Sequence, residues 1–350
     1  MNGPRLLSIL LLGATLPAFA RSSAPSTPPA KTAPAAANNS RQMTLDVVVT
    51  AKDGDLVPGL NRQDFSILDN KHPDSITAFA VHPPVSAVIV LDTVNTSFQT
   101  LSTERDQLEK FFLQNGGHLP LPVTLEIFSY SGLNVQEGAS TNGRAELDFL
   151  NRNPIAVHQN NQAQGLPGAF DRINRSIAAL QSMALSNLKV RGAKLLIWVS
   201  PGWPIPQESA LGLSEKEKTG IFDRIVTVSG LLMVSRTTLY SVDPLGTEDA
   251  GGFRISRYHY YLNEIKSPTQ PQVGNLALQV FATHSGGRVF VGSNDISGEL
   301  NDCLRDGSAF YSLSFDPPHA AHANEYHHLK IKLDKPELKA RARSRYYLQP

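Results

Sequence analysis

The side chains best suited to chemistry follow one apolar stretch in the first third of the chain. Residues 88–91 form a β-branched-rich run without alternation, and Asp92, Asn95 and Thr96 follow closely. Such a run predicts a strand that is buried on both faces of a parallel sheet. In open α/β sheets, ligands bind in the crevice at the carboxyl ends of the strands. We therefore expect a binding site at Asp92, where side-chain oxygens could hold a divalent cation or a partner.

Predicted strands and helices alternate from residue 84 to residue 307. The strands after the first are predicted at residues 123–130, 194–199, 238–242 and 288–291. Helical spacing of apolar residues predicts helices over 101–112, 170–184, 214–232 and 275–284, and Ser214 with Glu217 forms a capping box at the start of the third. Residues 133–164 are polar and irregular, with one short helix expected near 145–150. Because parallel strands need crossover connections, this alternation predicts a doubly wound α/β domain with a mostly parallel sheet.

The segments on either side of this domain, residues 43–83 and 308–348, have β character. Short apolar runs predict strands in both of them, for example at 45–49, 65–68, 311–315 and 329–333. Each segment is too small to form a stable core of its own. We therefore expect the two segments to fold together into one small antiparallel β-sandwich, into which the α/β domain of residues 84–307 is inserted.

The second of these segments is basic. Its cations recur at every second position, at Lys330 and Lys332 and again at Lys339, Arg341, Arg343 and Arg345. On one face of a sheet they could attract an anionic polymer of the cell envelope. Alternatively, such charges only protect exposed edge strands from aggregation. The net charge of the whole chain is +1, which argues against a nucleic-acid partner.

The first 42 residues differ in composition from the rest. Arg5 precedes an apolar run over residues 6–16, and Ala18-Phe19-Ala20 matches a cleavage site, so residues 1–20 are predicted to be a secretory signal peptide. Residues 21–42 are rich in Pro, Ala and Ser, which predicts a disordered linker. We expect cleavage near Ala20 and a mature protein that is periplasmic or secreted.

Several stretches, in the same order and spacing, resemble a known family. The stretch SAVIVLDTVNT at residues 86–96 resembles the first strand and metal-site loop of von Willebrand factor type A (VWA) domains. Other stretches resemble one bacterial branch, the VWFA-related Acidobacterial domain family, at residues 57–60, 63–69, 277–290, 294–295 and 311–317. This resemblance implies a VWA-like, Rossmann-like fold for the α/β domain. It also implies a protein-binding or adhesion module, because VWA domains are usually binding modules.

The hallmark of that family is a metal-ion-dependent adhesion site, in which D-x-S-x-S and two distant residues present oxygens to Mg²⁺ or Mn²⁺. The resemblance places Asp92, Thr96 and Ser200 at this metal site. Val94 stands at the first Ser position and has no donor atom, and Pro201 stands where the family often has an acid. Because Mg²⁺ tolerates poor geometry badly, we expect a degenerate site that binds Mg²⁺ or Mn²⁺ weakly or not at all, and no other cofactor. Asp92 and Thr96 would then cap the next helix or satisfy the loop backbone.

The sequence contains no nucleophile elbow, P-loop, zinc-protease motif or dinucleotide-binding motif. We therefore expect an exported, non-enzymatic protein-binding or adhesion module, whose protein ligand contacts Asn95 and Trp203 at the strand-end crevice. Trp203 could equally pack over its own loop. Two other classes stay open, a hydrolase or other enzyme that uses the same crevice and a purely structural envelope component. A convergent Ser, His and acid at the strand ends would favour the enzyme.

Overall fold

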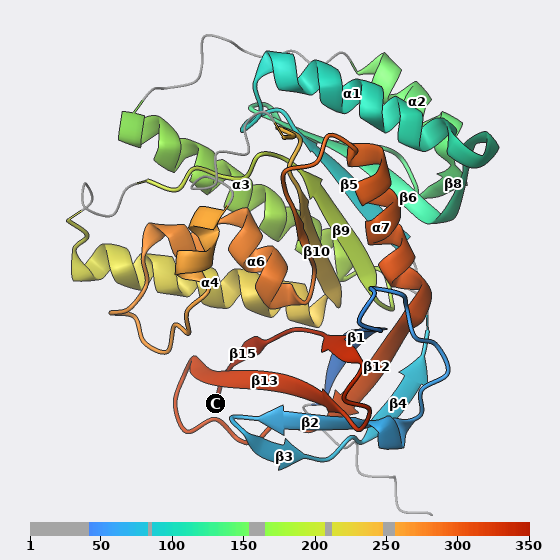
Figure 1. Ribbon diagram of the computed structural model, residues 1–350. Helices are drawn as coiled ribbons and strands as arrows, with labels where there is room; N and C mark the ends of the chain where they lie inside the picture. The colour runs from blue at the N-terminus through green and yellow to red at the C-terminus, as the bar shows by residue number, and fades with distance from the viewer. Residues whose placement is uncertain (1–41, 83–85, 154–164, 207–211, 248–255) are drawn as a thin grey trace, which may run out of the picture. The chain divides into compact units, whose positions relative to one another are not determined.

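Five parallel strands form the centre of a seven-stranded sheet in the computed structural model, which describes residues 42–82, 86–153, 165–206, 212–247 and 256–350 (Figure 1). The parallel strands are β5 (Ser86–Asp92), β6 (His118–Ser129), β9 (Lys194–Val199), β10 (Thr237–Val242) and β11 (Val289–Phe290). Two short strands, β7 (Gly132–Val135) and β8 (Ser140–Asn142), pair antiparallel with β6. Every residue of β9 is buried, which is the environment that a strand with a continuous apolar run requires.

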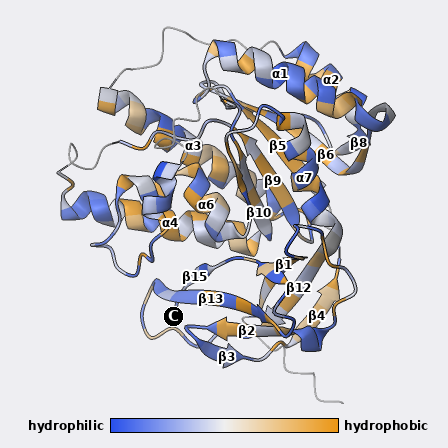
Figure 2. Cartoon of the chain, in the orientation of Figure 1, coloured by the Kyte–Doolittle hydropathy of each residue, from blue (hydrophilic) through white to orange (hydrophobic). Residues whose placement is uncertain are grey.

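Helices cover both faces of this sheet (Figure 1). α1 (Phe98–Leu113), α2 (Gly143–Arg152) and α7 (Ile296–Asp306) pack on one face, and α3 (Gly165–Asn187), α4 (Glu215–Val234) and α6 (Leu278–Ser285) pack on the other. Successive residues of β5 point to opposite faces, so Ile89 and Leu91 join the first core, whereas Val88 and Val90 join the second. Figure 2 shows the hydrophobic colouring of these central strands. Burial of both faces therefore fixes the sheet between the two layers of helices.

The loops between these strands and helices contain short 3₁₀ helices. They are η1 (Arg62–Asp64), η2 (Gln114–Gly117), η4 (Arg257–Tyr261), η5 (Val273–Leu276) and η6 (Gly307–Ala309). Of these, η4 and η5 lie between β10 and α6 in the chain, and η4 contributes residues to the site described below.

The order of the strands along the sheet reverses between β5 and β9. The order is β11-β10-β9-β5-β6-β7, so the chain passes from β5 to β6 on one side and from β9 through β10 to β11 on the other. At such a reversal the connections leave the sheet in opposite directions, which opens a crevice outside the carboxyl ends of the two strands. Asp92 ends β5 and Ser200 directly follows β9, so both residues lie at this reversal.

Two antiparallel sheets are built from segments on both sides of the α/β part of the chain. One has the order β14 (Lys339–Arg341), β1 (Met43–Thr50), β12 (Phe310–Phe315) and β4 (Ala78–Val81). The other has the order β15 (Arg345–Leu348), β13 (Glu325–Leu333), β2 (Phe65–Asp69) and β3 (His72–Asp74). Val47 of β1, Ile67 of β2 and Leu313 of β12 belong to one apolar core that the two sheets share.

Contacts join these antiparallel sheets to the helices of the α/β part, and Arg41–Pro350 form one compact unit. The ring of Phe222 on α4 contacts that of Tyr347 on β15, with centroids 5.8 Å apart. Nε of Arg236, directly before β10, donates a hydrogen bond of 3.2 Å to Asp46 of β1. The division of this unit into a sandwich domain and an α/β domain, with boundaries near residues 84 and 307, stays a prediction.

The structure confirms an α/β protein with a mostly parallel central sheet and additional antiparallel sheets. β9 has the predicted bounds, and the predicted capping box is present, because Ser214 Oγ accepts from the N–H of Glu217 while the Glu217 carboxylate accepts from the N–H of Ser214. In the stretch after residue 133, the predicted short helix is present as α2, whereas the prediction that the rest is irregular is wrong at β7 and β8. β7 and β8 are stabilised by pairing with β6, a contact that the local sequence pattern does not show.

The predicted signal peptide, residues 1–20, and all of the predicted linker except Gln42 lie outside the described residues. Among the residues that are described, no helix combines the length and the apolar character needed to cross a bilayer.

Candidate functional site

A cavity of about 440 Å³ lies at the carboxyl ends of β5 and β9. We call it the strand-end crevice. Its walls come from the loops after β5, β9 and β10, from helices α3 and α6, and from the 3₁₀ helix η4. The lining residues are Asn95, Ser97, Arg172, the stretch 201–205, Leu245, Arg257, Tyr258 and Gln279. The reversal of strand order therefore produces a real cavity at the place where the sequence predicts a site.

Asp92 is fully buried beside this crevice, and hydrogen bonds occupy both of its carboxylate oxygens. Oδ1 accepts from the backbone N–H groups of Val94 at 2.9 Å and of Asn95 at 3.0 Å. Oδ2 accepts from Nδ2 of Asn95 at 2.8 Å and from Nε1 of Trp198 at 2.9 Å. Burial raises the pKa of Asp92, whereas these hydrogen bonds and the hydroxyl of Ser200 act in the opposite direction. Asp92 therefore holds the loop after β5 in place.

These contacts fit a divalent cation poorly. A carboxylate offers about four lone-pair positions, and the four hydrogen bonds to Asp92 use them. Val94 has no donor atom, and the buried hydroxyl of Thr96 lies near Glu104 of α1. The predicted ligands Asp92, Thr96 and Ser200 thus lie at one edge of the sheet, but Asp92 is already committed to protein donors.

Glu104 on α1 is a second fully buried carboxyl group at this edge of the sheet. Neither of its oxygens has a hydrogen-bond partner among the described residues, although the nearby hydroxyl of Thr96 lowers its pKa. Burial, together with the negative charges of Asp92 and Asp243, raises the pKa of Glu104 well above its usual range. This environment favours the neutral form of Glu104.

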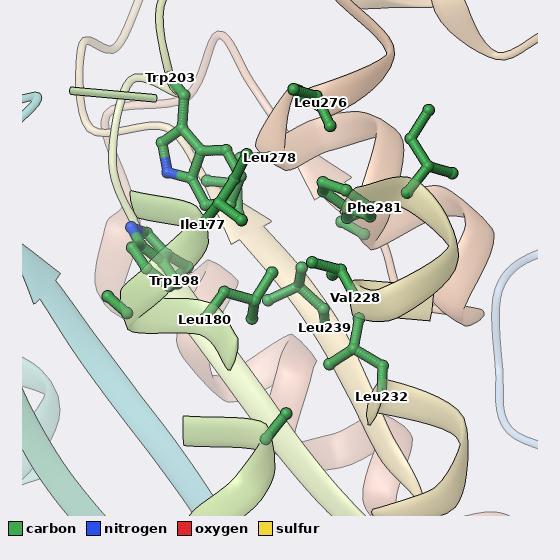
Figure 3. Close-up of a cluster of buried hydrophobic side chains, with 14 of the residues drawn as sticks. Ile177, Leu180, Trp198, Trp203, Val228, Leu232, Leu239, Leu276, Leu278 and Phe281 are labelled. Atoms are coloured by element: carbon green, nitrogen blue, oxygen red, sulfur yellow. The ribbon is translucent and has the colours of Figure 1, made fainter. Parts of the chain in front are cut away.

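Trp203 lines the crevice but is only 3% exposed. Its ring packs edge to face on Trp198, with centroids 5.4 Å apart, and lies 6.2 Å from the ring of Phe281. In Figure 3 the indole nitrogen of Trp203 is on the side of the ring opposite Leu276 and Phe281. This N–H has no hydrogen-bond acceptor among the described residues. The ring of Trp203 therefore packs on β9 and α6 and forms part of the crevice wall.

The charged residues that line the crevice, within the described part of the chain, are Arg172 and Arg257. Arg172 is half-buried on α3, and none of the described carboxylates pairs with it. Its neighbour Arg175, by contrast, pairs with Asp171 at 2.8 Å. The described lining also contains no histidine, so the Ser, His and acid that would favour a hydrolase are not assembled here. A cavity of this kind is suited to an anionic group.

The structure brings three of the predicted site residues together, since Asn95 bonds to Asp92 and the hydroxyl of Ser200 acts on the same carboxylate. Sequence reasoning missed Arg172 and Trp198. Trp198 lies inside a predicted strand, and Arg172 precedes the inward-facing Ile173 in a predicted helix, so no motif marks either residue. Both residues could be found only from the order of the strands in the sheet, because this order places α3 and β9 beside the loop after β5.

The predicted basic face on residues 339–345 is wrong for its arginines. They do not share one strand, because Lys339 and Arg341 lie on β14, Arg345 lies on β15 of another sheet, and Arg343 lies between the two strands. Arg343 and Arg345 are buried and donate to the backbone oxygens of Ser229 and Asn263, each at 3.3 Å. The reason is tertiary, because Arg343 reaches α4 and Arg345 reaches the loop after η4. They are therefore not available to a polymer.

Lys330 and Lys332 remain exposed on β13 and line a groove of about 690 Å³, which we call the lysine groove. Lys71 and Lys266 line the same groove, although they are distant in sequence. A hydrogen bond from Lys266, with the charges of Lys266 and Lys71, lowers the pKa of Glu264 beside them. Four lysines and the carboxylate of Glu264 therefore line the same groove.

Comparisons with known proteins identify no family for this chain. No family model matches it, and no curated protein matches it. The human COPII-coat protein Sec24c is similar at 11% sequence identity and a TM-score of 0.33, over 77% of this chain and 44% of that chain. Proximal thread matrix protein 1 from the mussel byssus is similar at 12% identity and a TM-score of 0.36, over 69% of this chain and 51% of that chain. The matched region thus spans about half of each of these structures.

Proposed function

We propose that this chain is an exported, non-enzymatic binding module of the VWA kind, whose partner is a protein that docks at the strand-end crevice. Its α/β domain would be inserted in a small β-sandwich domain. The sequence of residues 86–96 supports the VWA assignment, and so does the position of Asp92 at the reversal of strand order. Crevices at such reversals are where α/β folds bind their ligands.

The hydrogen bonds of Asp92 are the observation on which this proposal rests. Four donors of the protein itself occupy the carboxylate oxygens of Asp92. Few lone pairs are therefore free to coordinate Mg²⁺ or Mn²⁺. A partner would then be held by the side chains and backbone of the crevice, without a shared metal ion. In this proposal the adhesion site is degenerate as a metal site, and it still serves as a binding surface.

A capture experiment tests the proposal. The tagged mature chain is incubated with envelope extract in a chelator, and Leu245→Trp, which fills the crevice, is compared with Leu185→Trp on the exposed side of α3. We expect one protein to be retained by wild type and by Leu185→Trp but not by Leu245→Trp. Equal retention by all three chains, or retention that needs Mg²⁺, would contradict the proposal.

The enzyme alternative needs a base or a nucleophile at the crevice, and the described lining offers Ser97 without a histidine or a carboxylate. The purely structural alternative needs no cavity at all. Turnover of ester and peptide substrates by wild type, abolished in Ser97→Ala, would favour the enzyme over the binding module.

Export is the second part of the proposal. It rests on three features at the start of the sequence: the basic Arg5, the apolar run over residues 6–16 and the cleavage site Ala18-Phe19-Ala20. The mature protein should begin at Arg21 and be found in the periplasm or the medium. Mass spectrometry that finds an intact Met1 on soluble cytoplasmic protein would remove the basis for an envelope role.

The lysine groove favours a second ligand, an anionic polymer of the envelope, because Lys71, Lys266, Lys330 and Lys332 meet there. Retention on immobilised polyglutamate should fall as salt rises. It should also weaken in Lys330→Glu, whereas Lys339→Glu, which lies outside the groove, should have less effect. Equal weakening by the two substitutions would indicate attraction by net charge alone.

A further inference from the structure

We propose that the lysine groove is a binding site for phosphate groups, and that its ligand is a phosphodiester polymer whose successive phosphates contact Lys330 and Lys332. This inference rests on the second ligand proposed above, an anionic polymer of the envelope, and names the anion of that polymer. Three features of the groove support it: the lysines without ion-pair partners, their spacing on β13 and the strained backbone at Lys71.

The groove gathers positive charge from separate parts of the chain. Lys71 lies in the turn between β2 and β3, Lys266 lies in the loop after η4, and Lys330 and Lys332 lie on β13. Lys266 forms an exposed ion pair of 2.7 Å with Glu264, the carboxylate that lines the groove within the described part of the chain. None of the other three lysines pairs with a described carboxylate. The groove therefore keeps an excess of positive charge for a ligand.

The lysines on β13 form a row that suits a chain with repeated charges. Lys330 and Lys332 are alternate residues of one strand, so both side chains lie on the same face, roughly 7 Å apart along the strand. Leu68 lies opposite Lys330 on the neighbouring β2 and also lines the groove (Figure 1). A single small anion reaches only part of this row. A polymer that lies along β13 places one charge at each lysine.

The type of cation favours phosphate over carboxylate. The described lining contains no arginine, the residue whose planar guanidinium group matches a carboxylate with two parallel hydrogen bonds. A lysine ammonium group is a compact point charge with three rotatable donors, so it requires no planar ligand. A phosphodiester presents oxygens in a tetrahedral arrangement, and ammonium groups from different segments of the groove can contact them at the same time.

The backbone at Lys71 is strained. Asn70 and Lys71 form a two-residue turn between β2 and β3, with φ values of +47° and +72°. Turns of this type favour Asn or Asp followed by glycine, because a left-handed backbone strains most side chains. Lys71 therefore brings a charge to the groove at a position where glycine would be less strained. Residues kept in such conformations concentrate at functional sites.

Fluorescence anisotropy of labelled oligomers provides the test, with the mature chain at physiological salt. The probes are an oligomer of glycerol phosphate and an oligoglutamate of equal charge, and inorganic phosphate is the competitor. We expect the phosphate oligomer to bind about fivefold or more tightly than oligoglutamate. Inorganic phosphate should compete poorly, because it reaches only part of the row. Vesicles of phosphatidylglycerol present the same diester on a flat surface, and they should compete less well than unlabelled oligomer at equal phosphate concentration.

Substitutions on β13 assign the binding to the groove. Lys330→Gln and Lys332→Gln should each weaken binding of the phosphate oligomer, and each should reduce the slope of log affinity against log salt concentration by about one. The matched control, Lys339→Gln on β14, lies outside the groove and should change neither quantity.

Two further variants separate binding from folding. Glu264→Gln removes the carboxylate that competes for Lys266, and it should tighten binding of the phosphate oligomer by about threefold. Lys71→Gly removes a charge and relieves the turn. It should weaken binding while the midpoint of urea unfolding stays equal to that of wild type or rises.

Equal affinity for the two oligomers, tighter binding of oligoglutamate, or unchanged binding in Lys330→Gln would each overturn the inference. Tighter binding of the vesicles would also overturn it, in favour of a lipid headgroup. Failure of the underlying proposal gives a different result. If both oligomers bind equally and both depend on Lys330, the anionic polymer stands as a ligand and the phosphate does not. If neither oligomer depends on Lys330, both proposals fail.

Discussion

At the scale of single residues, the four hydrogen bonds of Asp92 set the conditions for any cation at the crevice. An ion that binds there must displace the N–H groups of Val94, Asn95 or Trp198. Each displaced donor would lose a charge-assisted hydrogen bond in a buried environment. Binding of a metal ion would therefore remove hydrogen bonds that stabilise the loop after β5.

Calorimetry can measure this competition. We expect Mg²⁺ and Mn²⁺ to show no saturable binding to wild type below the millimolar range, because the ligands that remain beside Asp92 are mostly neutral oxygens and water. Asp92→Asn, which keeps the size of the side chain, should give the same heats as wild type. Micromolar affinity in wild type that disappears in Asp92→Asn would show a working metal site.

Glu104 gives a prediction about pH. Its pKa is raised in the folded protein, chiefly by burial, so the folded state holds its proton more tightly than the unfolded state does. The stability of wild type relative to Glu104→Gln should be highest below the unfolded pKa and should fall as pH rises toward the folded pKa. Glu104→Gln should therefore match wild type at about pH 4 and be the more stable protein at about pH 8. Urea unfolding at both pH values measures the difference, with the exposed Glu109→Gln on α1 as control.

At the level of secondary structure, the sequence predicts the end of a helix well when nearby side chains form hydrogen bonds with its terminal backbone N–H groups. The start of α4 is the clearest case. Ser214 and Glu217 satisfy each other's backbone N–H groups, and these are contacts between residues three positions apart. The helix therefore begins where the sequence predicts it.

Ser214→Ala tests the cap. Removing the hydroxyl leaves the N–H of Glu217 without its acceptor, and a lost N-cap costs about 1 kcal/mol of stability. The midpoint of urea unfolding should fall while its slope is unchanged. Lys216→Ala in the same helical turn is exposed and serves as the control. Equal stability of Ser214→Ala and Lys216→Ala would mean that the cap contributes nothing.

At the scale of the whole molecule, the strands before and after the α/β part depend on each other. β1 lies between β14 and β12, so removal of residues 43–83 deletes both neighbours of β12 in that sheet, β1 and β4. The chain would then expose unpaired edges and half of a shared apolar core, which favours aggregation.

Coexpression of fragments tests this dependence. Residues 84–350 alone should be largely insoluble, and coexpressed residues 43–83 should restore soluble protein and copurify with it. Val47→Asp, at a fully buried position of β1, should prevent copurification, whereas Lys52→Ala in an exposed turn should not. If 84–350 is soluble and never binds the small fragment, the insertion of one domain into the other is wrong.

Features that depend on neighbouring residues could be predicted from the sequence. The burial of β5 and β9, the capped start of α4 and the acid at the end of β5 follow from local pattern, because strand and helix periodicity are properties of a short stretch. The general α/β class followed from the alternation of these elements.

The residues that surround that acid come from distant segments, and the fold brings them together. Strand order brings Arg172 from α3, Gln279 from α6 and Trp198 from β9 to the loop after β5, and no local pattern encodes contacts between segments so far apart in the chain. The same reason explains the error at Arg343 and Arg345. Their alternation resembles that of an exposed strand face, but α4 and the loop after η4 pack against them and bury them.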